Sequence, residues 1–409
     1  MQYAFANIYF IIAVELAREN STKSYLICHE VLTQLGEDIP QAFYIKQMPN
    51  MVKTTSTMVE RIVSDTDLLN LKEMNEEKTQ IMGFYGVMGA SARFSKPEMR
   101  LFLVCRKVQL TMNTDSLCKE SILGFIEYAA VLCGGGKDIE VALRLGKAAM
   151  SCFKKRYHSE IMTSRLTIFY YSFLAFYIEP LQSSADMFRL GFDVGMSVGE
   201  TVAAFFNAAY HIKTALAAGE SLPILLDKVD YYLGLAETYQ IKIANILLSI
   251  FRDTISTLIG KAGSTIPTQN YDTPAGVPNQ ILETMHIHSA IKAFWQGHCM
   301  RCQFLVEKLL KVSTCAGKTK DIDNMLILSI HGLNSFRVLR ARNINSHKIK
   351  SVPKVAINVF MTATSHSGWN FRNKVRYNNY RLILCFPLFV TPHTSFLNSC
   401  PYLLFRSIC

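Results

Sequence analysis

The sequence predicts an all-α protein, built as a right-handed α-solenoid of antiparallel helix pairs. Hydrophobic residues make up 50% of the chain and charged residues only 18%, so the chain must bury a large core and cannot be globally disordered. Helix-period apolar stretches of roughly 15 to 20 residues follow one another with short turns, which makes neighbouring helices antiparallel. A small-residue motif also recurs at a nearly constant spacing, as in stacked helix pairs.

The recurring motif is centred on glycine. The tripeptide Arg-Leu-Gly ends at Gly146 and again at Gly191, 45 positions later, and Leu-Gly-Leu is centred on Gly234 about 43 positions further on. Only Gly or Ala permits two helices to approach closely at such a position. We therefore expect Gly146, Gly191 and Gly234 to lie at contacts between helices.

Turn and cap residues divide the first half of the chain. Gly36 provides a helix stop, Pro97 suits a first helical turn, and Asp138 is a suitable N-cap. With the apolar periodicity, they predict helices at 14–35, 51–78, 81–94, 97–112, 118–132 and 139–157. No run of alternating hydrophobic residues is long enough to predict a sheet.

The second half continues this pattern up to a Gly- and Pro-rich interruption. Further helices are predicted at 161–178, 185–198, 201–217, 222–239 (capped by Ser221), 241–261, 279–298, 299–312, 321–342 and 355–363. One helix carries aromatic residues on nearly all faces, which predicts burial: Phe169, Tyr170, Tyr171, Phe173, Phe176 and Tyr177. The predicted organisation is a helical-repeat array at 1–262, a loop at 263–278, continuing repeats at 279–374 and an irregular, possibly unstructured tail at 375–409.

The net charge of +11 comes from the C-terminal part alone. Eleven of the 43 basic residues follow Asp323, where no acidic residue occurs, so the other 32 basic residues equal the 32 acidic ones. The basic balance therefore gives little support for nucleic-acid binding, and we predict no nucleic-acid partner. The alternative, a basic repeat face, would use Arg337, Arg340, Arg342, Lys348, Lys350 and Lys354.

Targeting signals and disulfide patterns are not recognisable. The eleven cysteines are scattered without a secretory pattern, and residues 1–17 lack a basic n-region and a cleavage site. The apolar run within 165–178 is too short to span a bilayer. We predict a cytoplasmic protein without a membrane segment.

Catalytic motifs are absent from the sequence, and no catalytic, cofactor-binding or metal-binding residue is predicted. The stretch 316–319 reads Ala-Gly-Lys-Thr, but Val312 stands where a phosphate-binding loop needs glycine. Glycines 134–136 before Lys137 have no preceding strand. The stretch 195–199 lies at the end of a predicted helix, where a nucleophile elbow needs a preceding strand. We therefore predict a protein that is not an enzyme and needs no cofactor.

The one alternative with a chemical site is a metal-binding or enzymatic helical protein that uses His298, Cys299 and Cys302. Cys299 and Cys302 share a helix face, and His298 is adjacent. His286 and His288 lie two positions apart, so they point in nearly opposite directions and cannot both face one ion. Packing of small residues in a helix hairpin explains the same pattern and is preferred.

Several blocks of sequence together resemble a known family. They are Cys28-x-x-Val31-Leu32-x-x-Leu35-Gly36 with Ile39-Pro40, Tyr85-x-x-Met88-x-Ala90-x-Ala92-x-Phe94, Gly146-Lys147-Ala148-Ala149, Ala293-Phe294-Trp295-x-Gly297-His298, His331-Gly332-Leu333-Asn334 and Ser367-x-Trp369-Asn370-Phe371. They are similar to the tetratricopeptide-like helical region of large signal-transduction AAA-type ATPases. The resemblance covers roughly 14–374.

The resemblance implies a regulatory segment that acts through contacts. In the family, a serine/threonine kinase-like domain and the ATPase come first, and a sensor histidine kinase or cyclase often follows. Nothing in this chain matches the kinase lysine, the Walker motifs or the phospho-acceptor histidine, so no catalytic residue carries over, and we expect a fragment truncated at both ends. The expected function is a non-enzymatic scaffold that binds a protein or interdomain partner in a concave helical groove.

Overall fold

The computed structural model describes residues 2–41, 47–135, 138–261 and 279–313, together with Ile330 and Asn334. Within these ranges the fold is all-α, as predicted, and the strands are limited to two dipeptides. Several predictions lie outside the described residues: the loop at 263–278, the tail at 375–409, the helix at 355–363, the stretch 316–319, the six basic residues from Arg337 to Lys354, and the helix at 321–342 apart from Ile330 and Asn334. No helix in the described part of the chain is long and apolar enough to cross a bilayer.

The N-terminal region differs most from the prediction. It contains α1 (Gln2–Glu19), α2 (Ser21–Gln34), α3 (Met48–Val59), α4 (Asp65–Leu69), β1 (Lys72–Glu73) and α5 (Glu76–Ser95). The predicted helix at 14–35 is wrong because Asn20 starts a new helix, its side-chain oxygen accepting from the Lys23 amide at 3.0 Å. The predicted helix at 51–78 is also wrong, since the Asp67 carboxylate accepts from the Ser64 amide and begins α4.

The central region follows the predicted elements closely. Its elements are η2 (Pro97–Met99), α6 (Arg100–Thr114), β2 (Ser116–Leu117), α7 (Lys119–Gly135), α8 (Ile139–Arg156), α9 (Glu160–Phe173) and η3 (Ala175–Tyr177). β1 and β2 pair in parallel, Lys72 with Ser116 and Glu73 with Leu117, which ties the start of α5 to the start of α7. Asp138 occupies the N-cap of α8, but its side chain makes no capping hydrogen bond.

The C-terminal described region consists of helices joined by short turns. They are α10 (Leu181–Ser197), α11 (Thr201–Ala217), α12 (Leu222–Thr238), α13 (Lys242–Ile259), α14 (Asn279–Trp295) and α15 (Cys299–Ser313). Gly199, Gly219, Gly260 and Gly297 follow helix ends with positive φ, a backbone region in which glycine has no steric cost. Gly199 and Gly219 thus follow the ends of the helices that were predicted at 185–198 and 201–217.

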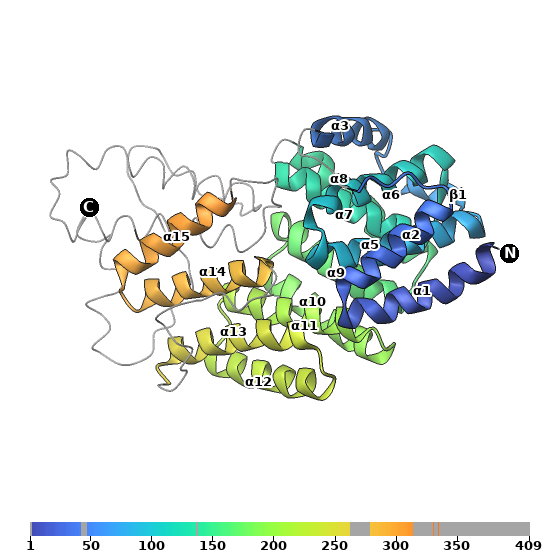
Figure 1. The fold of residues 1–409 in the computed structure, drawn as a ribbon. Helices are drawn as coiled ribbons and strands as arrows, with labels where there is room; N and C mark the ends of the chain where they lie inside the picture. The colour runs from blue at the N-terminus through green and yellow to red at the C-terminus, as the bar shows by residue number, and fades with distance from the viewer. Residues whose placement is uncertain are drawn as a thin grey trace, which may run out of the picture.

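The helices from α5 onward pack in a row (Figure 1). Each contacts its neighbours in sequence or the next helix but one, and α5, α7, α9, α11 and α13 contact one another in that order. The smaller helices α3 and α4 lie against α6 and α8. At the other end, α14 packs on α13, and α15 packs on α14.

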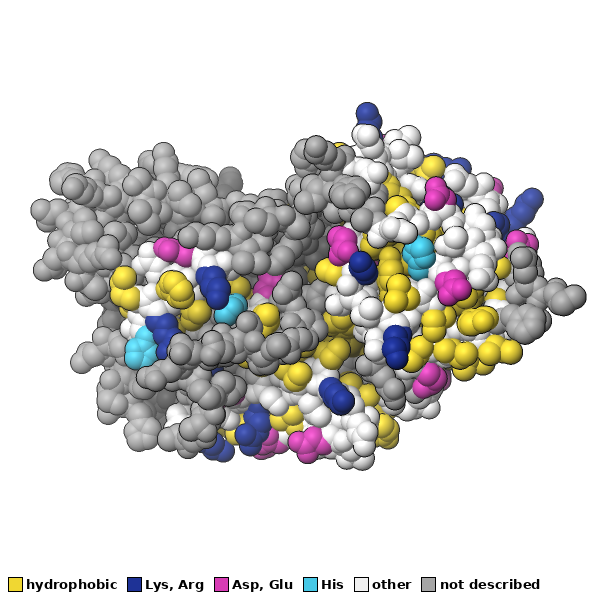
Figure 2. All heavy atoms as spheres, viewed as in Figure 1, with side chains coloured by type: hydrophobic (Ala, Val, Ile, Leu, Met, Phe, Trp, Pro, Cys, Tyr) yellow, Lys and Arg dark blue, Asp and Glu magenta, His cyan; other side chains and the backbone are white. Residues whose placement is uncertain are grey.

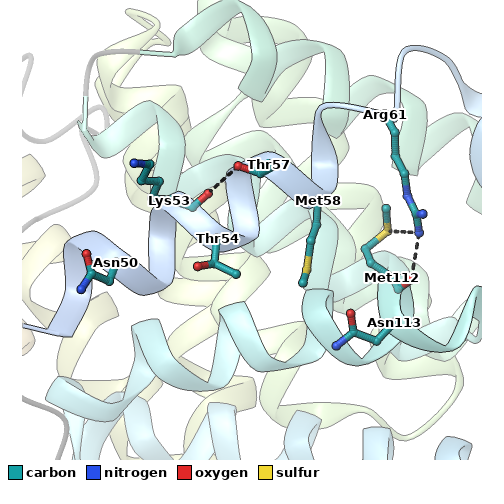
Figure 3. A pocket seen from close by; sticks show the side chains of 8 residues that line it. All are labelled: Asn50, Lys53, Thr54, Thr57, Met58, Arg61, Met112 and Asn113. Carbon is teal, nitrogen blue, oxygen red and sulfur yellow. Dashed lines mark hydrogen bonds between the residues drawn. The ribbon is translucent and has the colours of Figure 1, made fainter.

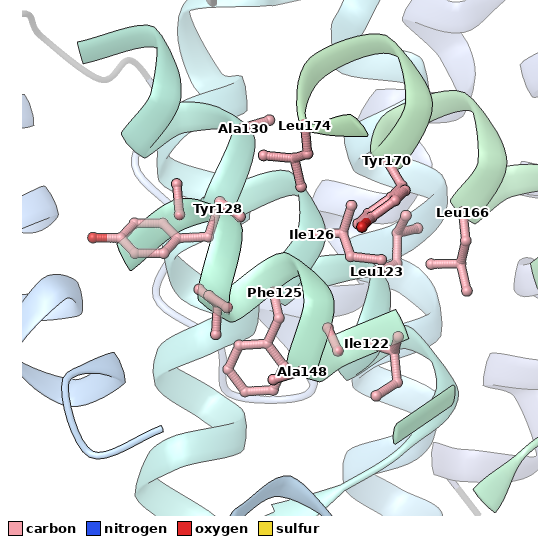
Figure 4. Close-up of a cluster of buried hydrophobic side chains, with 14 of the residues drawn as sticks. Ile122, Leu123, Phe125, Ile126, Tyr128, Ala130, Ala148, Leu166, Tyr170 and Leu174 are labelled. Atoms are coloured by element: carbon pink, nitrogen blue, oxygen red, sulfur yellow. The ribbon is translucent and has the colours of Figure 1, made fainter. Parts of the chain in front are cut away.

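The hydrophobic core is divided into several clusters along these helices, one of which is drawn in Figure 4. The largest is centred on α7, where Phe125, Ile126 and Tyr128 are fully buried. The aromatic group predicted to be buried belongs to it: Tyr170, Tyr171, Phe173, Phe176 and Tyr177 are buried, and Phe169 is partly buried against it. Full burial of such side chains stabilises the fold by about 1.5–3 kcal/mol each.

The three repeat glycines lie on α8, α10 and α12, one in each successive helix pair, but only two of them lie at close contacts. A Cβ atom on Gly146 would be 2.6 Å from Leu174 Cδ1, and one on Gly191 would be 2.6 Å from Asn207 Oδ1. A Cβ on Gly234 would meet no atom within 4 Å, so the expectation for Gly234 was wrong: this residue lies on the exposed face of α12.

Candidate functional site

One cavity among the described residues is an open groove between α3 and the C-terminal end of α6 (Figure 3). It has a volume of about 650 Å³. Its lining residues are Asn50, Lys53, Thr54, Thr57, Met58, Arg61, Met112 and Asn113. We call it the α3–α6 groove.

The polar wall of the α3–α6 groove is one face of α3. Asn50, Lys53, Thr54 and Thr57 are spaced by three and four residues, which places them side by side on a helix surface. All four side chains are exposed. Their residue types donate or accept hydrogen bonds, so this wall offers polar contacts along about two helical turns.

The opposite face of α3 is fixed to the body of the protein by partly buried hydrogen bonds. Gln109 Nε2 on α6 donates to Thr55 Oγ1 at 2.9 Å. The Tyr128 hydroxyl on α7 donates to the Val52 carbonyl at 2.9 Å and pairs with Ser56 Oγ at 2.8 Å. Because α3 is held at several points, the groove is preformed rather than dependent on a mobile helix.

Arg61 closes the end of the groove next to the C-terminus of α6. Its Nη2 donates to the Met112 carbonyl at 2.8 Å and lies 3.4 Å from Asp115 Oδ1. Asp115 has φ of 48°, the left-handed conformation in which the helix ends. A cation at the last carbonyls of a helix is favourable because it opposes the negative end of the helix dipole.

The charge of the groove is positive. Lys53 and Arg61 are its charged lining residues, and no Asp or Glu is among the lining residues. Met58 and Met112 add polarizable apolar surface at the base. The groove therefore suits a segment that presents carboxylates and amides next to small apolar side chains.

The predicted metal alternative places its residues on different sides of a helix. Cys302 is buried in the α14–α15 cluster, Cys299 is partly buried and His298 is exposed. His288 is buried and its Nδ1 lies 3.1 Å from Thr254 Oγ1. In the described ranges, no group of three or more His, Cys, Asp or Glu side chains is arranged to hold a metal ion.

The sequence missed a set of buried and partly buried ion pairs between helices. Lys107 on α6 pairs with Glu127 on α7, and Arg165 on α9 lies 3.6 Å from Glu120 on α7 and 2.7 Å from Glu200 before α11. Burial raises the pKa of Glu120, and the charge of Arg165 opposes this. The signal was present in the sequence, since Glu120 and Glu127 are seven residues apart and therefore share one face of a helix.

An apolar surface covers the outer side of α1 (Figure 2). Its exposed hydrophobic side chains include Ile8, Tyr9, Ile11 and Ile12, of which Ile11 is 63% exposed. Contiguous exposed apolar patches mark contact surfaces more often than isolated residues do. The patch lies on a terminal helix, away from the groove.

None of the protein-family models, curated proteins and solved structures compared with this chain matches it.

Proposed function

We propose that this chain is a non-enzymatic, tetratricopeptide-like right-handed solenoid that acts as a scaffold, binding an acidic segment of a partner protein in the α3–α6 groove. The observation that carries the proposal is the groove itself: a preformed polar face of α3, with Lys53 and Arg61 and without a lining carboxylate. The serial contacts from α5 to α13 support the solenoid. The resemblance to signalling ATPases supports a regulatory role, with the partner in the same polypeptide or in an associated ATPase or kinase.

The dimensions of the groove favour a helix or a short extended segment as the bound element. Its wall spans about two turns of α3, so a partner helix would present side chains at i, i+3, i+4 and i+7. Glutamates in this pattern would meet Lys53 and the exposed part of Arg61, and a leucine or methionine between them would cover Met58. Exposed ion pairs contribute only about 0.2–1 kcal/mol each, so the complex would be transient.

A peptide titration tests the proposal. The probe is a fluorescent helical 15-residue peptide with Glu and Leu at i, i+3, i+4 and i+7, compared with the same peptide carrying Gln for Glu. We expect the Glu peptide to bind more tightly, and its affinity to fall as the salt concentration rises. Lys53→Glu should weaken binding several-fold, because it replaces an attraction of about 0.2–1 kcal/mol by a repulsion of similar size.

Lys242→Glu is the matched control. Lys242 is exposed at the start of α13, far from the groove in sequence. Its replacement by Glu changes the net charge of the protein by the same amount as Lys53→Glu does. If the Glu and Gln peptides bind equally, or if both lysine variants lose the same affinity, the groove is not the docking site.

A further inference from the structure

The helix α1 carries apolar side chains on two opposite faces. Its inner face packs on α2 and α5, where Ala6 and Ala13 are buried. The Phe10 ring meets the Phe84 ring of α5 edge to face, with centroids 5.4 Å apart. The outer face bears four large hydrophobic side chains that are 41–63% exposed: Ile8, Tyr9, Ile11 and Ile12. We call these four residues the α1 patch.

The composition of α1 indicates that its outer face is a contact surface. A helix that is apolar all round is normally buried, whereas the end of a helical row that faces water needs a polar outer surface. Between Gln2 and Ala17 the only charged residue is Glu15. The α1 patch therefore has the character of an interface and not of a solvated helix face.

The spacing of the α1 patch makes it complementary to itself. Its residues are symmetric about position 10, and with about 3.6 residues per turn Ile8 and Ile12 project opposite Phe10. In an antiparallel pair of α1 helices with a two-fold axis at position 10, Ile8 would face Ile12 of the second copy. At the edges, Ile11 would lie beside Ile8 of the second copy, and Tyr9 beside Ile12 of the second copy. Each patch residue would thus meet another, as in an isologous contact.

The charge of α1 favours this antiparallel pair over other occupants. Helices that lie on an anionic lipid surface carry Lys and Arg beside their apolar face, but the charged residue of α1 between Gln2 and Ala17 is acidic. A parallel pair would place the two Glu15 residues at the same level. In the antiparallel pair they lie about 15 Å apart along the helix axis, ten residues at 1.5 Å each, so their repulsion is largely screened.

The area of the α1 patch limits the strength of the contact. Apolar patches of this kind cover roughly 300–600 Å², so two of them would bury about 600–1,200 Å². Stable specific complexes bury about 1,200–2,000 Å². The contact is therefore sufficient for a weak, reversible complex and too small for a permanent one.

We propose that the α1 patch is the interface through which two copies of this chain form a weak antiparallel dimer. The patch lies away from the α3–α6 groove (Figure 1), so the dimer leaves both grooves open. Two grooves in one assembly would bind a partner with two acidic segments more tightly than one groove does, because the second contact is then intramolecular.

Sedimentation velocity of the full chain, from low to high micromolar concentration, tests the proposal. We expect the monomer to convert to a dimer as the concentration rises, without larger species, because an isologous contact closes on itself. A monomer at every concentration, or continued growth beyond the dimer, would overturn the proposal. So would a monomer that binds to lipid vesicles, since the α1 patch would then be a lipid contact.

Two charged variants test the antiparallel arrangement. Ile8→Lys and Ile12→Glu should each weaken self-association at least tenfold, because each brings two like charges together at the centre of the interface. Mixing the two variants should restore a dimer, since the new lysine of one copy faces the new glutamate of the other and the remaining Ile12 and Ile8 still meet. A parallel pair brings no such charges together, so a mixture that stays monomeric would show that the arrangement is wrong.

A matched control and a milder variant keep the result specific. Ile224→Glu places the same charge on another exposed isoleucine, 51% exposed on α12, and should dimerise like the parent protein. Ile11→Ala removes apolar area without adding charge and should weaken the dimer several-fold, which provides a second test if a charged variant fails to fold. If Ile224→Glu weakens the dimer as much as Ile12→Glu does, the interface is not the α1 patch.

The groove and the dimer can fail independently. Ile12→Glu should bind the Glu peptide like the parent protein, because the α1 patch is separate from the α3–α6 groove. Lys53→Glu should dimerise like the parent protein. Loss of dimerisation in Lys53→Glu would place the interface at the groove and overturn its assignment to α1.

Discussion

Two helices, α10 and α12, each carry a Leu-Gly pair of the recurring motif and use the glycine differently. On α10, Gly191 and Gly195 face the neighbouring helices: a Cβ on Gly195 would lie 2.6 Å from Ser164 Oγ on α9 and 3.1 Å from the Ala204 Cα on α11. On α12, Gly234 points into open space. A glycine therefore marks a close helix contact only where another helix crosses at its position. A repeated sequence motif does not establish a repeated packing contact.

Around α10 the close approach permits a buried polar contact among three helices. Asn207 Nδ2 on α11 donates to the Ser164 carbonyl at 2.8 Å, and Ser164 Oγ on α9 donates to the Gly191 carbonyl at 2.9 Å. Each of these groups is fully buried or nearly so, so each bond replaces one with water and would be costly to lose. The close approach of α9 and α11 to the glycines of α10 thus makes these buried hydrogen bonds possible.

The largest expected effect is the difference between Gly191→Leu and Gly234→Leu. At Gly191 the new side chain would displace Asn207 and break the bonds to Ser164, so we expect a loss of about 3 kcal/mol or more in the free energy of unfolding. At Gly234 we expect a change of less than about 1 kcal/mol, since nothing opposes the side chain. Urea unfolding of both variants measures these changes in the free energy of unfolding. Equal losses of stability would show that the close helix contact at Gly191 is not specific.

The contact between α11 and α12 should make stability depend on pH. His211 is 3% exposed, and its Nδ1 lies 2.9 Å from the Tyr232 hydroxyl. Burial, assisted by the positive charge of Lys228, lowers the pKa of His211 to about 4. The unfolded chain, with a pKa near 6.5, takes up a proton before the folded protein does, so stability present above pH 6.5 is lost as the pH falls towards 4.

Between pH 6.5 and 4, the loss of unfolding free energy due to His211 should reach roughly 3 kcal/mol. This figure follows from about 1.36 kcal/mol for each unit of difference between the folded and unfolded pKa values. Urea unfolding between pH 7.5 and 4.5 checks it against His211→Gln, which keeps a hydrogen-bonding partner for Tyr232 and cannot be protonated. The parent protein should lose more stability on acidification than the variant. Parallel curves would show that folding does not lower the pKa of His211.

A double-mutant cycle between Gly191 and Asn207 refines the comparison. Gly191→Ala places a methyl group against the Asn207 amide, and Asn207→Ala removes that amide together with its buried bonds. Each single variant should lose about 1–3 kcal/mol, but together they should lose less than the sum by about 1 kcal/mol or more, since the clash is absent in the double variant. Gly234→Ala combined with Asn207→Ala is the additive control.

The sequence predicted the helical class and most helices from α5 onward because these helices carry strong apolar periodicity and end at glycines. It failed at 14–35 and 51–78, where Asn20 and the Ser64–Asp67 pair begin new helices within a continuous apolar pattern. Local hydrogen bonds of single polar side chains decide such breaks, and periodicity does not register them.

The candidate sites were less predictable than the fold. Asn50, Lys53 and Thr57 are spaced as one helix face, which the sequence shows, but only the position of α6 makes that face a groove wall. The hydrogen bond from Arg93 on α5 to Tyr210 on α11 joins residues 117 positions apart. Contacts between helices so far apart in the sequence depend on the tertiary packing, which no local pattern specifies.

The smallest effect is the most direct test of the difference between the two glycines. Gly234 lies in the interior of α12 with its Cβ position free, so Gly234→Ala should stabilise the protein by about 0.5–1 kcal/mol through higher helix propensity and a less flexible unfolded chain. Gly191→Ala should have the opposite sign. Urea unfolding of both variants measures the two signs, provided that the dependence of the unfolding free energy on urea concentration is unchanged. If Gly234→Ala lowers the unfolding midpoint, another helix covers that face of α12. Gly234 would then lie at a close helix contact, as Gly191 does.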